Sequence, residues 1–156
     1  MENNNPQLDL FLDFSEKLTA FDDYTLNGTG QVEEYYFHIN QIIGDDIMKK
    51  LLDQFQSIKD QADFEQSLRA EILSCELLGP VTRNIIKLWF TGTWYQLPKK
   101  WMEKYSINDL DKTYVISSRS YVEGLMWPTI GTHPMGAKGP GYGTWTEAPN
   151  IPTIKD

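Results

Sequence analysis

The last 29 residues, 128–156, constrain the fold of this chain most, because they hold five glycines and five prolines. Proline has no backbone N–H and glycine loses the most conformational freedom on ordering, so no helix or central strand is expected to run through this segment. The same segment carries large apolar side chains, among them Ile130, Met135, Tyr142 and Trp145. A solvated tail has little reason to display such side chains, so we expect another surface to cover them.

Residues 1–127 instead have the apolar periodicity of helices, with large apolar side chains at every third or fourth position. This spacing predicts five helices, over about residues 8–20, 32–44, 45–55, 63–79 and 80–92. Asp45 or Asp46 is expected to cap the third helix, because a carboxylate accepts from the free N–H groups of a first turn. Gly79-Pro80 is expected to end the fourth.

A sixth, short helix is expected between a cap at Ser117 or Ser118 and Pro128. Residues 93–116 are expected to be irregular, with one short helical turn, and with Tyr114–Ile116 extended but unpaired. The predicted fold is therefore all-α. It is a compact irregular helical bundle of about five to six helices over residues 1–127, with a long extended Gly/Pro-rich C-terminal arm over residues 128–156 that docks on a partner.

The charge of the chain excludes some classes of partner. The net charge of −8, from 14 basic and 22 acidic residues, argues against nucleic-acid binding, which needs clustered lysine and arginine. The charge is uneven, since residues 1–78 hold 5 basic and 16 acidic side chains and residues 79–156 hold 9 and 6. No run of about 18 apolar residues occurs, so no transmembrane segment is expected, and the sequence as given shows no export signal.

The sequence offers little catalytic chemistry. Its two histidines, His38 and His133, lie far apart in the sequence and neither is part of a His/Cys metal-binding motif, so no metal site is expected. Residues 139–143 superficially resemble a phosphate loop, but Pro140 removes a backbone donor and no strand precedes them. Cys75 lies on the apolar stripe of its helix and is expected to be a small buried hydrophobe. We therefore expect no catalytic residue and no cofactor-binding residue in this chain.

The aromatic residues point to protein binding instead. All five tryptophans lie in the second half of the chain, where Trp89 and Trp127 are expected to be core residues. Trp145, among glycines and prolines, is hard to bury within the chain, and tryptophan and tyrosine favour the centres of protein interfaces. We expect Trp145, Tyr142 and Ile130 to be the anchors of the arm. The full set of expected partner-binding residues is Trp127, Pro128, Ile130, His133, Pro134, Tyr142 and Trp145.

Several segments occur in an order that is typical of a known family. Phe90-Thr91-Gly92 ends a helix, residues 121–125 follow the pattern aromatic-x-Glu-x-Leu, and residues 134–145 form a Gly/Pro arm that ends in an aromatic. Residues 11–23 look like the family's opening helix, with Ala20 in place of a glycine. In this order the segments resemble the small, gamma-type, non-catalytic subunit of bacterial FAD-dependent sugar and alcohol dehydrogenase complexes. This family includes the sorbitol dehydrogenase small subunit and subunit 3 of gluconate 2-dehydrogenase.

The resemblance implies a subunit that binds, stabilises and helps mature or export a large flavoprotein of the glucose-methanol-choline type. In that family the large subunit holds the FAD and acts on a sugar or polyol, and a multihaem cytochrome c, which carries haem c, often completes the complex. The resemblance further implies a periplasmic or membrane-associated location. A cytoplasmic location is the alternative, because no signal peptide is visible in the sequence as given.

Two other functions remain open from the residues alone. One is a helical adaptor or chaperone for an unrelated protein, since a fold does not determine a function. The other is a small stand-alone enzyme that uses His133 and nearby carboxylates in a pocket closed by the arm, although a second catalytic group is not evident. The identity of the partner distinguishes the dehydrogenase subunit from the adaptor.

Overall fold

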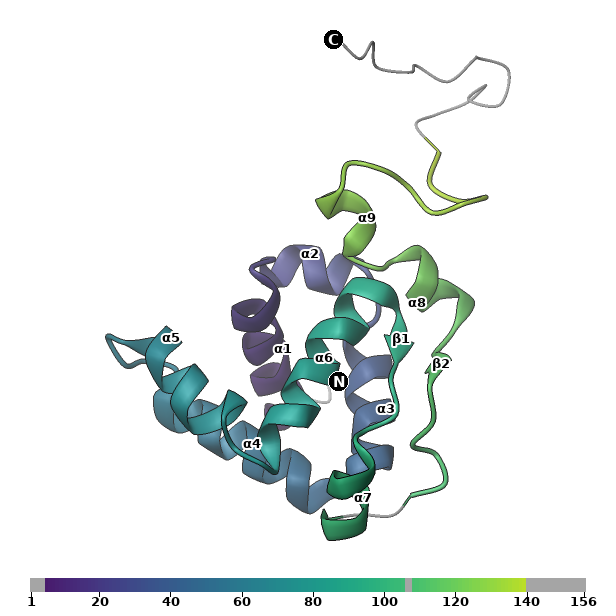
Figure 1. The fold of residues 1–156 in the computed structure, drawn as a ribbon. Coiled ribbons are helices and arrows are strands. Elements are labelled where there is room, and N and C mark those ends of the chain that lie inside the picture. The colour runs from purple at the N-terminus through teal and green to yellow at the C-terminus, as the bar shows by residue number, and fades with distance from the viewer. Residues whose placement is uncertain (1–4, 106–107, 140–156) are drawn as a thin grey trace, which may run out of the picture.

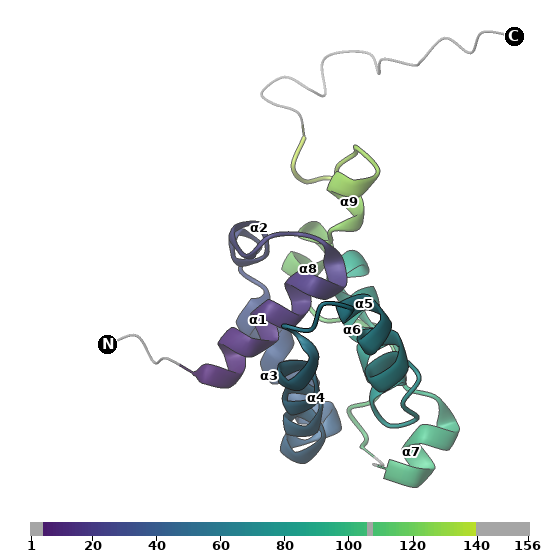
Figure 2. The ribbon, with the colours of Figure 1, turned by 90° about the vertical axis from the view of Figure 1, so that its left-hand side faces the viewer.

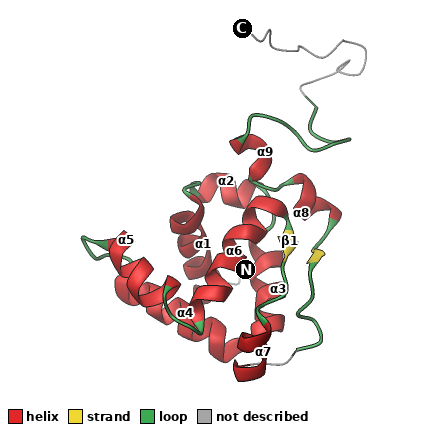
Figure 3. Ribbon diagram, in the orientation of Figure 1, coloured by secondary structure: helices red, strands yellow, loops and turns green. Residues whose placement is uncertain are grey.

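The computed structural model describes residues 5–105 and 108–139, and most of this part of the chain is helical (Figures 1 and 3). Four helices of 12 to 14 residues form the body: α1 (Pro6–Thr19), α3 (Val32–Ile43), α4 (Asp45–Ile58) and α6 (Leu78–Thr91). Shorter elements complete it: α2 (Asp23–Gly28), α5 (Phe64–Ser67), the π-helix η1 (Leu68–Leu73), α7 (Lys99–Tyr105), α8 (Ser118–Val122), α9 (Met126–Thr129), β1 (Thr93–Trp94) and β2 (Tyr114–Val115). The all-α prediction is confirmed, and these short helices bring the described residues above the expected five to six helices.

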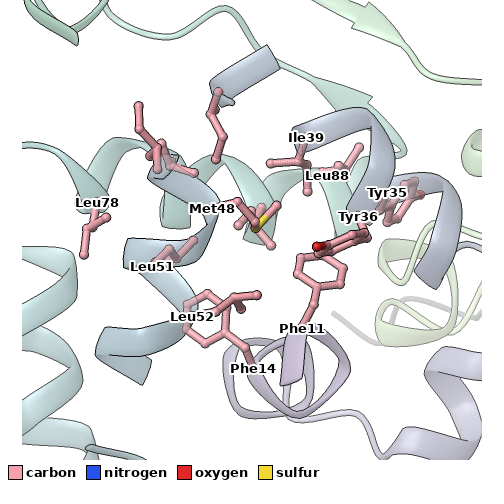
Figure 4. Packing of buried hydrophobic residues seen from close by; sticks show 14 of the residues in the cluster. Phe11, Phe14, Tyr35, Tyr36, Ile39, Met48, Leu51, Leu52, Leu78 and Leu88 are labelled. Carbon is pink, nitrogen blue, oxygen red and sulfur yellow. The ribbon is translucent and has the colours of Figure 1, made fainter. Parts of the chain in front are cut away.

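The long helices pack around one hydrophobic core, in which α1 contacts α3, α4 and α6 (Figure 4). Phe14 of α1 packs against Phe55 of α4, with 4.9 Å between the ring centroids. Tyr35 of α3 meets Trp89 of α6 edge to face at 4.9 Å, and Trp89 is 1% exposed. Trp89 is therefore a core residue, as predicted. Each such buried aromatic side chain stabilises the fold by about 1.5–3 kcal/mol relative to an exposed one.

Local chemistry explains where the first long helices begin and end. The Asn5 side chain accepts from the backbone N–H of Gln7 at the start of α1, and Ala20 ends this helix with a left-handed φ of 61°. Gly44 ends α3 with a φ of 85°, a value that glycine adopts without steric cost. Asp45 is the first residue of α4 and Gly44 is its cap, so the prediction that Asp45 or Asp46 caps this helix is wrong. The two carboxylates still lie in the positive first turn.

The predicted fourth helix, residues 63–79, is also corrected. The chain forms α5 and then the π-helix η1, which ends at Leu73, and Gly79 and Pro80 lie inside the first turn of α6. A first turn needs no N–H from proline, which explains why Pro80 is tolerated there. Gly79 is needed because a Cβ at this position would lie 2.3 Å from the Leu73 carbonyl oxygen. Cys75, between the two helices, is half-buried rather than fully buried.

Residues 23–28, for which the sequence predicts no helix, form the helix α2. The Asp22 side chain accepts from the backbone N–H of Thr25 at 2.8 Å and so caps this helix. Leu26 is fully buried and anchors α2 to the core. A single buried residue in six is too short a pattern for helical periodicity to be recognised.

Tyr114–Val115 is paired, which contradicts the prediction of an unpaired segment. It forms an antiparallel ladder with β1, in which Thr93 lies opposite Val115 and Trp94 opposite Tyr114. The partner strand β1 has only two residues and precedes β2 by about 20 positions. A strand this short has no alternating pattern from which the pairing could be predicted.

The end of α6 packs against α8, near the end of the molecule where α9 lies. Gly92 ends α6, as predicted, with a φ of 67°, and a Cβ there would lie 2.3 Å from the Ser120 carbonyl oxygen. Ser117 caps α8 through reciprocal hydrogen bonds with Ser120, which confirms the expected serine cap. The helix ends at Val122 instead of Trp127. Gly124, just after it, passes so close to α6 that a Cβ there would lie 2.8 Å from the Phe90 carbonyl oxygen.

Candidate docking surface

One end of the molecule, where α2, α8 and α9 meet, brings together most of the described residues that the sequence predicted for partner binding (Figure 1). A hollow of about 420 Å³ lies at this end. Thr25 and Thr29 line it from the side of α2. The residues that line it from α9 and the segment after it include four predicted ones: Trp127, Pro128, His133 and Pro134.

Trp127 is half-buried in the wall of this hollow. Its indole N–H donates to the Tyr121 carbonyl oxygen at 2.8 Å, and the two rings meet edge to face with 5.4 Å between centroids. Trp127 is therefore less buried than the core residue expected from the sequence. Its ring and that of Tyr121, which is 36% exposed, join α8 to α9 and hold α9 in place.

Pro128 does not end a helix. It is the third residue of α9, where no N–H is required, and the helix continues to Thr129. The boundary expected between a helical body (residues 1–127) and an arm (residues 128–156) thus falls inside this short helix. Figure 2 shows α9 projecting from the body on the side of α2.

The other predicted residues differ in their exposure. Ile130, which follows α9, is 63% exposed, whereas Pro134 is buried. His133 is exposed, and its Nδ1 lies 3.1 Å from the Pro134 carbonyl oxygen and 3.2 Å from that of Ala137. Both neighbours are acceptors, so Nδ1 carries the proton and donates. The two remaining predicted residues, Tyr142 and Trp145, lie outside the described residues.

Two further apolar side chains are exposed at this end, and neither was among the predicted site residues. Tyr24 on α2 is 84% exposed and Met135 is 86% exposed. The sequence does not predict Tyr24 as a site residue, because residues 23–28 show no helical periodicity, although an aromatic that follows two aspartates in a polar stretch is a usable signal. We call the hollow, together with Tyr24, Ile130 and Met135, the docking surface. Large exposed apolar side chains on neighbouring segments are typical of sites of protein interaction.

The charged groups at the docking surface do not pair along one helix. The Glu123 carboxylate pairs with the Lys138 ammonium and not with Arg119, four residues before it. The Arg119 guanidinium lies beside Gly30, close enough that a Cβ on Gly30 would approach Nη2 to 2.3 Å. At the edge of the surface, hydrogen bonds from Thr25 lower the pKa of Asp22, which keeps this cap ionised.

The second histidine lies elsewhere. His38 is on α3, and its Nε2 is hydrogen-bonded to the Tyr114 hydroxyl of β2. Burial lowers the pKa of His38, and the charge of Glu34 acts weakly against this shift. Within residues 5–105 and 108–139, no three His, Cys, Asp or Glu side chains are grouped so that they could hold a metal ion. In the same part of the chain, no helix has the length and apolar character needed to cross a membrane.

Comparisons of the chain with known protein families, with curated proteins and with solved structures find no match. Its function is therefore inferred from its own residues and geometry.

Proposed function

We propose that this chain is a non-catalytic small subunit that binds, stabilises and helps mature or export an FAD-dependent sugar or polyol dehydrogenase of the glucose-methanol-choline type. The proposed large subunit would hold the FAD and the substrate, and a multihaem cytochrome c would accept the electrons. The family resemblance of residues 83–98 and 121–145 supports the choice of partner.

The observation that carries the docking role is the exposure of Tyr24, Ile130 and Met135, which belong to the segments whose other residues line one hollow. Tyr24 and Met135 each leave more than four-fifths of their surface in water. Burying such side chains against a partner contributes about 25 cal/mol per Å² of apolar area, and a few side chains of this kind dominate many interfaces.

The test is co-expression with a large flavoprotein of this type encoded beside the chain, followed by affinity capture and measurement of flavin absorbance. A flavin-containing complex that oxidises a sugar or polyol, and that does not form without this chain, is the expected result. Failure of the two proteins to co-purify would overturn the proposal and favour the helical adaptor with an unrelated partner.

Matched variants test whether the flavoprotein binds at the docking surface. Ile130→Asp and Met135→Asp are expected to weaken binding of the flavoprotein by at least about tenfold, because each puts a charge into a desolvated contact. Leu110→Asp is the control, since Leu110 is 51% exposed but lies in the segment that Asn108 ties to the C-terminal end of α3. Equal binding by all three variants would show that the docking surface is not part of the interface with the flavoprotein.

A further inference from the structure

Residues 132–138, which we call the loop, close on themselves beside the hollow. The Thr132 N–H donates to the Trp127 carbonyl oxygen at 3.0 Å, and the Ala137 N–H donates to that of Pro134 at 3.2 Å. The His133 ring spans the same turn through its contacts with the carbonyls of Pro134 and Ala137. These contacts lie within a few residues of one another, so on their own they hold a turn together but do not attach it to the body.

Pro134 packs the loop against the body, and the polar contact that joins the loop to the segment after α8 is the ion pair between Lys138 and Glu123. Glu123 directly follows α8, and its side chain is only 18% exposed, whereas that of Lys138 is 49% exposed. Such a pair is better shielded from water and salt than a surface pair such as Lys99–Glu103, in which the side chains are 86% and 60% exposed. Removal of the cation would leave a mostly buried carboxylate without a partner, which is costly.

The backbone of Lys138, one member of this pair, is in a conformation that is locally unfavourable. Lys138 has a φ of 50°, in the left-handed region that residues with a Cβ disfavour. Ala20 is the other non-glycine residue with a positive φ in the described part of the chain, and there the conformation serves to end a helix. A strained residue of this kind persists only when its surroundings over-determine it, and the ion pair with Glu123 is one contact that holds Lys138 in place.

We propose that the Glu123–Lys138 pair is a latch that keeps the loop closed and so pre-organises the docking surface. The closed loop buries Pro134, completes the hollow and positions the exposed Met135. Opening it would remove one wall of the hollow. The latch itself is a property of this chain alone, and its effect on partner affinity rests on the proposed function.

The latch is tested on the full chain by NMR measurement of amide hydrogen exchange at Ala137, with the amides of α6 as an internal reference. Lys138→Met and Glu123→Gln are expected to speed exchange at Ala137 about fivefold or more, without changing α6. Raising the salt to about 1 M should speed exchange at Ala137 in the unmodified chain but not in Lys138→Met, because salt screens only an existing pair.

Two further variants complete the test. Lys99→Met removes the cation of the exposed Lys99–Glu103 pair and should leave exchange at Ala137 unchanged. The charge-exchanged double variant, Glu123→Lys with Lys138→Glu, should exchange more slowly at Ala137 than either of its single variants, because the attraction is restored. If Lys138→Met exchanges at the rate of the unmodified chain and keeps its salt dependence, the latch does not exist.

The same variants measure the consequence for binding. If only the closed loop binds, lowering its population to a tenth weakens the apparent affinity for the flavoprotein about tenfold. Lys138→Met should therefore bind more weakly by the factor by which its closed fraction, obtained from the exchange data, falls. An affinity that does not follow this closed fraction would show that the latch does not pre-organise binding. Should the unmodified chain not bind the flavoprotein at all, the proposed function fails, while the exchange experiment still decides whether the latch exists.

Discussion

The Asp111 carboxylate accepts a hydrogen bond from the indole N–H of Trp94 at 2.9 Å, although 17 residues separate the two along the chain. Both residues are buried, with exposed fractions of 3% and 0%. The same carboxylate accepts from the backbone N–H of Leu97 at 3.2 Å. Asp111 thereby holds the segment after β1 against the segment that leads into β2.

Asp111→Ala is expected to lower the free energy of unfolding by about 2–4 kcal/mol, because two buried donors lose their acceptor. Asp109→Ala is the control, since Asp109 is exposed, and should change stability by less than about 0.5 kcal/mol. Urea unfolding followed by tryptophan fluorescence measures both. Equal stabilities of the two variants would show that the Asp111 contacts contribute nothing.

Gly92→Ala is expected to destabilise the chain by about 2 kcal/mol or more, because φ is positive there and the new Cβ would meet backbone. That Cβ would lie 2.3 Å from the Ser120 carbonyl oxygen, and the Ser120 hydroxyl also donates to the Gly92 carbonyl at 2.9 Å. Gly28→Ala is the matched control, since no atom lies within 4 Å of a Cβ at Gly28. Thermal unfolding should show a lower Tm for Gly92→Ala alone, and similar Tm values would contradict the predicted clash.

Tyr35→Phe is expected to leave the stability unchanged or to raise it by about 1 kcal/mol. The hydroxyl of Tyr35 is buried and has no hydrogen-bond partner among the described residues. Burial raises the pKa of this hydroxyl far above its ordinary value, and the charges of Glu34 and Glu123 add to the shift. Tyr36→Phe is the contrasting variant, because the Tyr36 hydroxyl donates to the Gln7 side chain at 2.8 Å. Loss of this hydrogen bond should lower the free energy of unfolding. A clear loss of stability in Tyr35→Phe, measured by urea unfolding, would contradict this prediction.

The pair of His38 and Tyr114 predicts a pH dependence of stability. Burial lowers the pKa of His38 in the folded chain, so the unfolded chain binds the proton more readily. The stability contributed by neutral His38 is fully present above its unfolded pKa of about 6.5 and is lost as the pH falls toward the folded pKa. Urea unfolding between about pH 5.5 and 7.5 should show this fall.

His38→Gln should flatten the dependence in that pH range, whereas His133→Gln should keep it because His38 is intact. Glu34 on the same helix and Tyr114 on β2 are the titratable groups that act on His38, and the hydroxyl of Tyr114 stays neutral here because burial raises its pKa. An unchanged slope in His38→Gln would assign the dependence to other groups.

Much of the helical body was predictable because helix formation is encoded locally. Apolar residues at every third or fourth position place α1, α3, α4 and α6 within a few residues of their observed bounds. Gly44 and Gly92 end two of these helices as expected, since the required left-handed or extended turn suits a residue without Cβ. The short α2 was missed because one buried residue makes no pattern.

The docking surface was predictable only in part. Its apolar residues after α8 stand out in a segment of glycine and proline, so Trp127, Pro128 and Ile130 could be nominated from composition. Tyr24 could not, because its exposure at this end of the molecule depends on how α2 packs.

The sequence alone therefore specifies which face of each long helix is buried and where most of these helices end, because both depend on residues within about one turn of each other. Only the tertiary structure decides what each buried face meets. The pairing of β1 with β2, the Asp111 contact to Trp94 and the choice of Lys138 over Arg119 as the partner of Glu123 all join distant segments. Such contacts form because the shared core brings the segments together. The periodicity of a sequence indicates which residues are buried, but not which residues they contact.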